Sequence, residues 1–420
     1  MCGEVQVKNS RLISIDDARE GLVLTADVVS EGGQCLLPAG AILTEGTIES
    51  LRRRGISEVE VSGEEKREYS EEELINARGI CKEAVENRFP STAREDPHLS
   101  ALKETILEIE SIRYLETGRA PNAASTQIDF SNEPPEPLKT KDADLDSFIR
   151  SLDELPVLPE VVVEVNRLLQ SEDVLIEEVS ALVEKDAGLT AKILRLANSS
   201  YYGLSYHVDT LSRALTVLGL NTVRNLAMAL ALHGVIGDDP GEREEVVGLW
   251  GHSLGTAVSS KALISVKTPK LEEKAFICGL LHDIGKVVLY KNFKKEMEMI
   301  WNTVKAGGEE EELERMTFGF SHAEVGGALS KRWHFPEELT EAIIKHAGDE
   351  GIRRRDPLMV SVHAGNQIAR ALGLGVSVER KVAMVDPECW NILGITPPEL
   401  SEITKKVNRA YTDLLSAWDV

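Results

Sequence analysis

The chain lacks any apolar run that could cross a membrane. No stretch approaches the roughly 18 consecutive apolar residues that a transmembrane helix needs. The opening residues, Met1 to Lys8, also lack the apolar core of a secretory signal peptide. These absences predict a protein with no membrane span and no secretion, and we expect it in the cytoplasm.

Cysteine is scarce and scattered. The five cysteines among 420 residues form no C-x-x-C pair. Without paired spacing, neither a disulfide framework nor a cysteine-ligated zinc site is expected. The pattern is typical of a reduced compartment.

Positive charge is in deficit. Lys and Arg total 47 against 70 Asp and Glu, which gives a net charge of -23. Such a chain repels polyanions unless its basic residues gather on one face. The two triple-arginine runs, Arg52 to Arg54 and Arg353 to Arg355, would point in different directions on a helix, so we interpret each as solvated surface. We expect no binding to nucleic acid.

The first part of the chain has the pattern of short strands. From residue 11 to residue 63, brief apolar stretches are separated by turns that contain Gly or Pro. Thr44 can cap a helix that ends at Gly55, and a last strand follows from Ser57 to Val61. We predict a small β-rich module over residues 1–63.

The next part changes in character. Glu71 to Asn87 and His98 to Tyr114 have helical spacing and predict a helical hairpin or a dimerising stalk, so a homodimer is one expected outcome. Ala120 to Asp142 is rich in proline and acidic residues and has almost no large apolar residue, which is typical of a linker. We predict a helical segment and linker over residues 64–143.

The rest of the chain is predicted to be helical. From residue 144 to residue 420, apolar residues recur at intervals of three and four, and no strand pattern competes. The predicted fold is therefore multidomain: a small β-rich (α+β) module, a helical linker and an all-α domain.

One stretch in the helical half carries chemistry. Residues 279–286 read Gly-Leu-Leu-His-Asp-Ile-Gly-Lys and place His282 beside Asp283. An imidazole and a carboxylate together suit Mn, Fe or Zn. A His-Asp pair alone arises often by chance, but with Leu-Leu before it and Ile-Gly-Lys after it the stretch resembles the signature of the HD phosphohydrolase superfamily.

The resemblance extends well beyond this stretch. Over about 200 residues, from Leu152 to His346, the chain resembles the HDOD family of HD-related output domains. Residues 1–63 resemble the module that precedes HD-GYP phosphodiesterase domains. The residues that carry the HDOD resemblance are 155–159, 186–199, 214–219, 279–286 and 332–336.

The superfamily resemblance implies a set of metal ligands. They are His252, His282, Asp283, His322 and His346, and the implied ion is a divalent Mn, Fe or Zn.

The chain also departs from the superfamily pattern. Asn366 stands where the closing Asp would be, and an amide offers only a neutral, weak oxygen. Ala347 stands where HD-GYP domains have a second consecutive histidine, and no Gly-Tyr-Pro follows it.

The remaining candidates have plainer interpretations. Lys286 could meet a phosphate in an active relative and is the catalytic candidate only if the chain is an enzyme; otherwise we interpret it as a surface lysine at a helix end. Five further histidines have no ligand position and are interpreted as structural: His98, His207, His233, His334 and His363.

Two functions remain open. The first is a non-catalytic signal-transduction output protein that acts through a protein partner. The second is a metal-dependent phosphohydrolase acting on a nucleotide or cyclic dinucleotide ligand. Asn366 and Ala347 favour the first, whereas the intact stretch at 279–286 together with His252 and His322 favours the second.

Overall fold

The computed structural model divides the chain into two compact units, Met1–Glu73 and Leu74–Val420. It describes residues 10–16, 18, 22, 24–26, 28–29, 35–37, 41, 43, 45–62, 69–121, 145–151, 164–165, 168, 175–199, 206–220, 222–223, 244–305, 308–333, 335–346, 355–375 and 381–418. The predicted linker therefore lies outside the described residues from 122 onward. Each unit is considered by itself.

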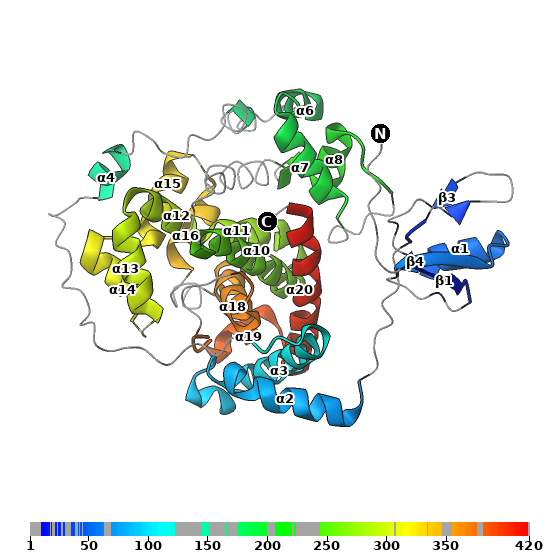
Figure 1. The fold of residues 1–420 in the computed structure, drawn as a ribbon. Coiled ribbons are helices and arrows are strands. Elements are labelled where there is room, and N and C mark those ends of the chain that lie inside the picture. The colour runs from blue at the N-terminus through cyan, green and yellow to red at the C-terminus, as the bar shows by residue number, and fades with distance from the viewer. Residues whose placement is uncertain are drawn as a thin grey trace. The chain divides into compact units, whose positions relative to one another are not determined.

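The first unit contains two small antiparallel strand pairs and one helix (Figure 1). β1 (Ser10–Ser14) pairs with β4 (Glu58–Ser62), and β2 (Val28–Val29) pairs with β3 (Cys35–Leu37). The helix α1 (Glu45–Arg53) lies between β3 and β4 in sequence. β1 is an element that the sequence analysis did not identify.

The core of this unit follows from two periodicities. Val59 and Val61 alternate along β4 and are buried, as expected of a strand with one covered face. Ile48 and Leu51 lie three residues apart on α1 and join the same cluster. Together with Leu24, which bridges to Val61, they form a small core of the unit's own.

The second unit is helical throughout its described residues. Its elements are α2 (Glu71–Glu86), which begins at the unit boundary, η1 (Ser91–Arg94), α3 (Pro97–Thr117), α4 (Leu145–Ser151), α6 (Ile176–Val183), α7 (Ala187–Ala197), α8 (Leu211–Leu218), α10 (Glu244–Ser265), η2 (Pro269–Leu271), α11 (Glu272–Leu281), α12 (Ile284–Asn292), α13 (Lys294–Lys305), α14 (Glu310–Phe318), α15 (His322–Arg332), α16 (Glu337–Lys345), α18 (Pro357–Leu372), α19 (Pro387–Leu393) and α20 (Pro397–Trp418).

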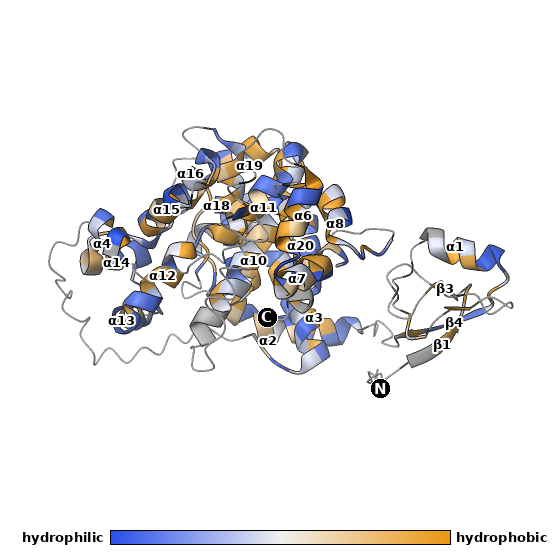
Figure 2. Cartoon of the chain, turned by 90° about the horizontal axis from the view of Figure 1, so that it is seen from above, coloured by the Kyte–Doolittle hydropathy of each residue, from blue (hydrophilic) through white to orange (hydrophobic). Residues whose placement is uncertain are grey.

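The centre of this unit is α10, which packs along α11 and α18. Two glycines let the helix backbones approach closely. A Cβ on Gly279 of α11 would lie 2.8 Å from the Ala257 Cα, and one on Gly365 of α18 would lie 2.5 Å from the Ser260 Oγ. Figure 2 shows hydrophobic and hydrophilic stretches side by side on the helices, as expected of amphipathic helices around a shared core.

Helix α3 packs against the C-terminal part of this unit, and Cys81 of α2 contacts the Glu110 carbonyl of α3. α3 contacts α18 and α20. The His98 ring stacks on Trp390, with 5.1 Å between ring centroids, so His98 has the structural role that was expected. Arg88 donates to Glu110 Oε1 at 2.9 Å and to the Ala371 carbonyl at 3.0 Å. The division between the two compact units falls between Glu73 and Leu74.

The predicted fold class is confirmed. Among the described residues, strands occur only up to Ser62, and the elements after it are helical. Three cysteines that the structure describes, Cys81, Cys278 and Cys389, are buried. In the described part of the chain, no helix has both the length and the apolar character needed to cross a membrane.

The buried carboxylate of Glu110 generates a stability prediction. Glu110 is 3% exposed and pairs with both Arg88 and Arg113. Glu110→Gln would leave the Arg88 guanidinium without its counter-charge, which costs about 3 kcal/mol in a buried pair. The measurement is urea unfolding of the full chain. The matched control is Glu104→Gln on the same helix, whose exposed pair with Arg78 should change stability by less than about 1 kcal/mol; equal effects of both variants would contradict the assignment.

Candidate metal centre

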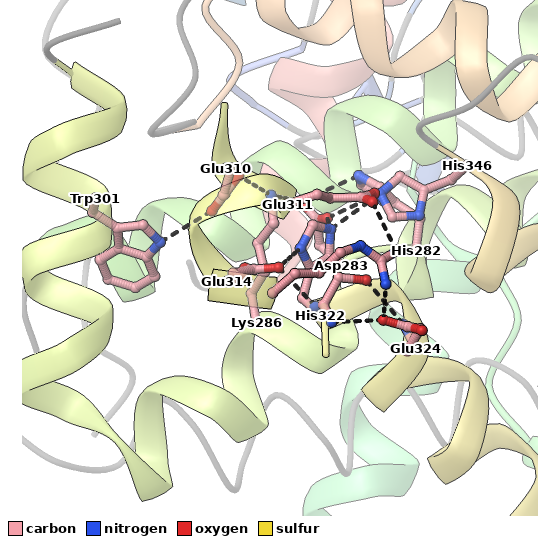
Figure 3. Close-up of polar contacts among 12 residues, drawn as sticks. His282, Asp283, Lys286, Trp301, Glu310, Glu311, Glu314, His322, Glu324 and His346 are labelled. Atoms are coloured by element: carbon pink, nitrogen blue, oxygen red, sulfur yellow. Dashed lines mark hydrogen bonds and ion pairs between the residues drawn. The ribbon is translucent and has the colours of Figure 1, made fainter. Parts of the chain in front are cut away.

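The five predicted ligands come together from separate helices. His282 and Asp283 are the two residues between α11 and α12, His322 is the first residue of α15, and His346 directly follows α16. His252 lies within α10. Figure 3 shows His282, Asp283, His322 and His346 converging on one another. Each of the five is at most 3% exposed.

Three donor atoms form a nearly equilateral triangle. The Nε2 atoms of His322 and His346 lie 3.4 Å apart, and each is 3.5 Å from Asp283 Oδ1. Around an ion with bonds of about 2.1 Å, a tetrahedron has edges of about 3.4 Å. The triangle therefore has the size of one face of a tetrahedral site and could hold a divalent ion.

Hydrogen bonds at the opposite ring nitrogens set the tautomers of these histidines. Nδ1 of His346 lies 2.8 Å from the Ile343 carbonyl, and Nδ1 of His282 lies 2.7 Å from the Gly279 carbonyl. A carbonyl only accepts, so each Nδ1 carries the proton and each Nε2 offers a lone pair. Such a partner on the far nitrogen is the usual arrangement of metal-ligating histidines.

Glu314 is the corresponding partner of His322 at its Nδ1 atom. Its Oε2 accepts the His322 backbone N–H at 2.7 Å and lies 2.6 Å from Nδ1. Burial raises the pKa of Glu314 to about 8. An ionised Glu314 therefore needs nearby positive charge, and a metal on His322 Nε2 would supply it through the ring.

The charges in the cluster match a metal-ligand set. Burial lowers the pKa of His282, and together with the charge of Lys286 it lowers the pKa of His322 to about 3. Burial would raise the pKa of Asp283, but His282 and Lys286 hold it well below its usual range. At neutral pH His282 and His322 are thus neutral imidazoles beside an ionised Asp283, the forms that bind metal.

Unsatisfied polar atoms support the same interpretation. Asp283 Oδ1 and His282 Nε2 are buried and have no hydrogen-bond partner among the described residues. Buried polar atoms are rarely left without a partner. When Glu314 accepts from Nδ1 of His322, the Nε2 atoms of His322 and His346 both offer lone pairs, 3.4 Å apart, to a cation. The donor set therefore fits a divalent metal.

The second carboxylate oxygen of Asp283, Oδ2, has different neighbours. It lies 3.2 Å from His282 Nε2 and 3.2 Å from Lys286 Nζ. His252 faces Asn366, with 3.0 Å between Nε2 and Oδ1. His252, His282 and Asp283 form a second buried group of donor atoms that could hold a metal ion, and Nδ1 of His252 has no hydrogen-bond partner among the described residues.

Lys286 is buried, contrary to expectation. The sequence analysis interpreted it as a surface lysine, but it is only 4% exposed. Its Nζ lies 2.9 Å from Glu310 Oε2 in addition to its contact with Asp283. Although burial would lower its pKa, Asp283 and Glu310 raise the pKa of Lys286 above its ordinary value. The surface interpretation was wrong because the first turn of α12 faces inward.

Sequence reasoning missed Glu310 and Glu314. They lie four residues apart on α14, and both are buried. In the sequence they belong to an acidic run that reads as a solvated helix start. The sequence signal that could have identified them is their i,i+4 spacing, which places them on one face of the helix. In the structure, Trp301 Nε1 donates a hydrogen bond to Glu310 Oε1 at 3.1 Å.

Several other predicted residues lie elsewhere. His363 is buried on α18 and its Nδ1 lies 3.2 Å from the His346 carbonyl, so it supports the segment that carries a candidate ligand. His207 is exposed. His233 and His334 lie outside the described residues, as does Ala347.

The cavity that reaches the centre is small. Leu249, Trp250, Ser253, Leu280 and Ile284 are among the residues that line it, and Asp283 is its charged member. Its volume is about 10 Å³. That is close to the space that one water molecule requires.

Gly285 sets the spacing between the two helices that carry Asp283 and His322. A Cβ at Gly285 would overlap the carbonyl oxygen of His322. Gly285→Ala should therefore force α12 and α15 apart, break the triangle of donor atoms and destabilise the chain by about 3 kcal/mol. Urea unfolding would measure this.

The control for this substitution is another helical glycine. Gly79 of α2 is exposed, and nothing lies within 4 Å of an added Cβ. Gly79→Ala should stabilise the chain by about 0.5 to 1 kcal/mol because alanine is the better helix former. If Gly285→Ala unfolded at the wild-type urea concentration, the close approach of the two backbones would be refuted.

Comparisons with known proteins agree with this architecture. Residues 155–348 match the sequence profile of the HDOD domain. The structure of an HDOD domain protein of unknown function from Geobacter sulfurreducens is similar, with 26% identity, a TM-score of 0.52, and coverage of 66% of this chain and 96% of that one. A Shewanella amazonensis SB2B protein provisionally named a phosphohydrolase is 25% identical, with a TM-score of 0.52 and coverage of 64% and 97%.

A relative among curated proteins is an uncharacterized protein of Treponema pallidum (strain Nichols). It is 28% identical over 241 residues, which are 54% of this chain and 44% of that protein. The match thus spans less than half the length of the relative. From the profile match and the similar structures, the chain carries an HDOD domain at residues 155–348, and all five candidate ligands lie within it.

Proposed function

We propose that this chain is a signal-transduction output protein whose HDOD domain holds a metal ion as part of its fold and acts through a protein partner. The observation that carries the proposal is the closed centre. Its ligand atoms converge in metal-binding tautomers, yet every ligand is almost fully buried and the adjoining cavity has room for about one water molecule.

A metal would be held by Asp283, His322 and His346. This two-histidine, one-carboxylate set suits Mn, Fe or Zn. When bound, such an ion supplies positive charge to the buried carboxylates and can polarise a water molecule. His282 and His252 lie on the other side of Asp283 and, in this proposal, support the centre instead of completing it.

Hydrolysis of a cyclic dinucleotide fits the site poorly. Ligands of that size occupy pockets of about 300 to 1,000 Å³. The cavity beside Asp283 that the described residues form is far smaller. In addition, Asn366 contributes no negative charge where a second ion would need a carboxylate.

The role as an output protein rests on the resemblance to HD-related output domains and on the two-unit organisation. The first unit has its own small core and no cluster of catalytic side chains among its described residues. A module of this kind serves best as a docking or sensory element. The helical unit would then pass its state to a protein partner.

A metal-dependent phosphohydrolase is the second candidate. It is favoured by the donor triangle, which supplies three of the four ligands of a tetrahedral ion, and by a water-sized cavity beside Asp283. A bound ion with one open position is the arrangement found in catalytic metal sites. The provisional name of the Shewanella relative points the same way.

Metal content tests the centre. We expect the purified, untagged protein to hold a divalent ion, and His322→Ala to lose most of it because one corner of the triangle is removed. Inductively coupled plasma mass spectrometry measures the content. His207→Ala is the control, since His207 is exposed and far from any candidate cluster. Equal metal content in all three proteins would reject the centre.

Turnover separates the two candidate functions. With added Mn²⁺ or Fe²⁺, we expect no hydrolysis of cyclic di-GMP or a linear dinucleotide above the level without protein, because the cavity that the described residues form beside Asp283 is too small for either substrate. Chromatography of the nucleotides measures the reaction. Hydrolysis that is abolished by Asp283→Ala would establish the phosphohydrolase and refute the non-catalytic role.

A further inference from the structure

Lys286 stands where a second cation would stand. Its Nζ lies 3.2 Å from Asp283 Oδ2 and 2.9 Å from Glu310 Oε2, so the ammonium bridges two buried carboxylates (Figure 3). His282 Nε2 faces the same Oδ2 at 3.2 Å. A second ion on the donor group of His252, His282 and Asp283 would use this Oδ2, which the ammonium already contacts.

We propose that Lys286 is the centre's built-in second cation, which limits the centre to one metal ion on Asp283 Oδ1, His322 and His346. This inference rests on the metal centre proposed above. It assigns the two oxygens of Asp283 to two different cations, the metal on Oδ1 and the ammonium on Oδ2.

The balance of charge supports a single ion. Asp283 and Glu310 carry two negative charges and Lys286 carries one positive charge, so the three together are singly negative. One divalent ion brings the group to one net positive charge, and a second ion would bring it to three. Buried charge without compensation is strongly unfavourable. A neutral Asn366 offers the second ion no help.

The counter-charge is held firmly in place. Glu310 begins α14, and its other oxygen accepts a hydrogen bond from Trp301 Nε1 at 3.1 Å. Trp301 in turn stacks on Tyr290 of α12, with ring centroids 5.1 Å apart. Removal of the ammonium would therefore leave Glu310, Asp283 and His282 facing a vacated cation position.

The test is the number of Mn²⁺ ions that the full chain binds. We expect one ion in the wild type, two in Lys286→Met, and one in Lys291→Met, a control with the same change at an exposed position of the same helix. Electron paramagnetic resonance should show an isolated Mn²⁺ in the wild type and an exchange-coupled pair in Lys286→Met, since ions that share a carboxylate lie about 4 Å apart.

A double variant covers the case in which Lys286→Met fails to fold. Lys286→Met with Glu310→Gln removes both charges and leaves no unpaired buried carboxylate. It should bind one Mn²⁺ at least tenfold more tightly than the wild type, because the ammonium no longer competes for Asp283. A lysine with a merely structural role predicts the opposite, a weaker site.

The outcomes separate this inference from the proposed function. No Mn²⁺ on the wild type would reject the metal centre itself. Two ions on the wild type would keep the centre and overturn the role of Lys286. One ion on the folded Lys286→Met variant, or an unchanged affinity in the double variant, would also overturn it.

Discussion

The buried carboxylate of Asp283 is the constraint on which the helical unit depends. It is 3% exposed and ionised, and an isolated carboxylate in such a place would be strongly unfavourable. Four side chains supply positive charge or polar contacts to it: His282, Lys286, His322 and His346. These residues come from α12 and from the ends of α11, α15 and α16. Their contacts with Asp283 therefore constrain the relative positions of these four helices.

Close backbone packing makes that convergence possible. Gly285 lets α12 lie directly against the start of α15, and Gly279 and Gly365 let α11 and α18 lie against α10. Donor atoms 3.4 to 3.5 Å apart require the segments that carry them to be placed within a few tenths of an ångström. A bulkier residue at Gly285 moves the backbone and not merely a side chain. The Gly after His-Asp-Ile therefore belongs to the site as much as the ligands do.

Periodicity predicted the helical class and the β-rich first unit, because it reports on single elements, and the resemblance to the HD phosphohydrolase superfamily supplied the five candidate ligands. Neither predicted the partners of those ligands. Glu310 and Glu314 are hidden in an acidic run, and only tertiary packing turns that face of α14 inward. Lys286 was assigned to the surface because a lysine near a helix end is usually solvated, and the two carboxylates that hold it come from different parts of the chain. The same limit applies to α3, whose burial against α18 and α20 depends on contacts about 300 residues away along the chain.

A centre of this kind suits an output domain better than an open catalytic site would. An ion bound to Asp283, His322 and His346 would join α12, α15 and α16, and through Glu314 and Glu310 it would also join α14. An ion that binds only the folded state, at a free concentration a hundred times its dissociation constant, stabilises that state by about 2.7 kcal/mol. That free energy would stabilise the packing of four helices together. No substrate needs to enter the site for this effect. Under the proposed function, a partner that recognises this arrangement would respond to the occupancy of the centre through helix packing, and the buried ligands and the small cavity agree with that role.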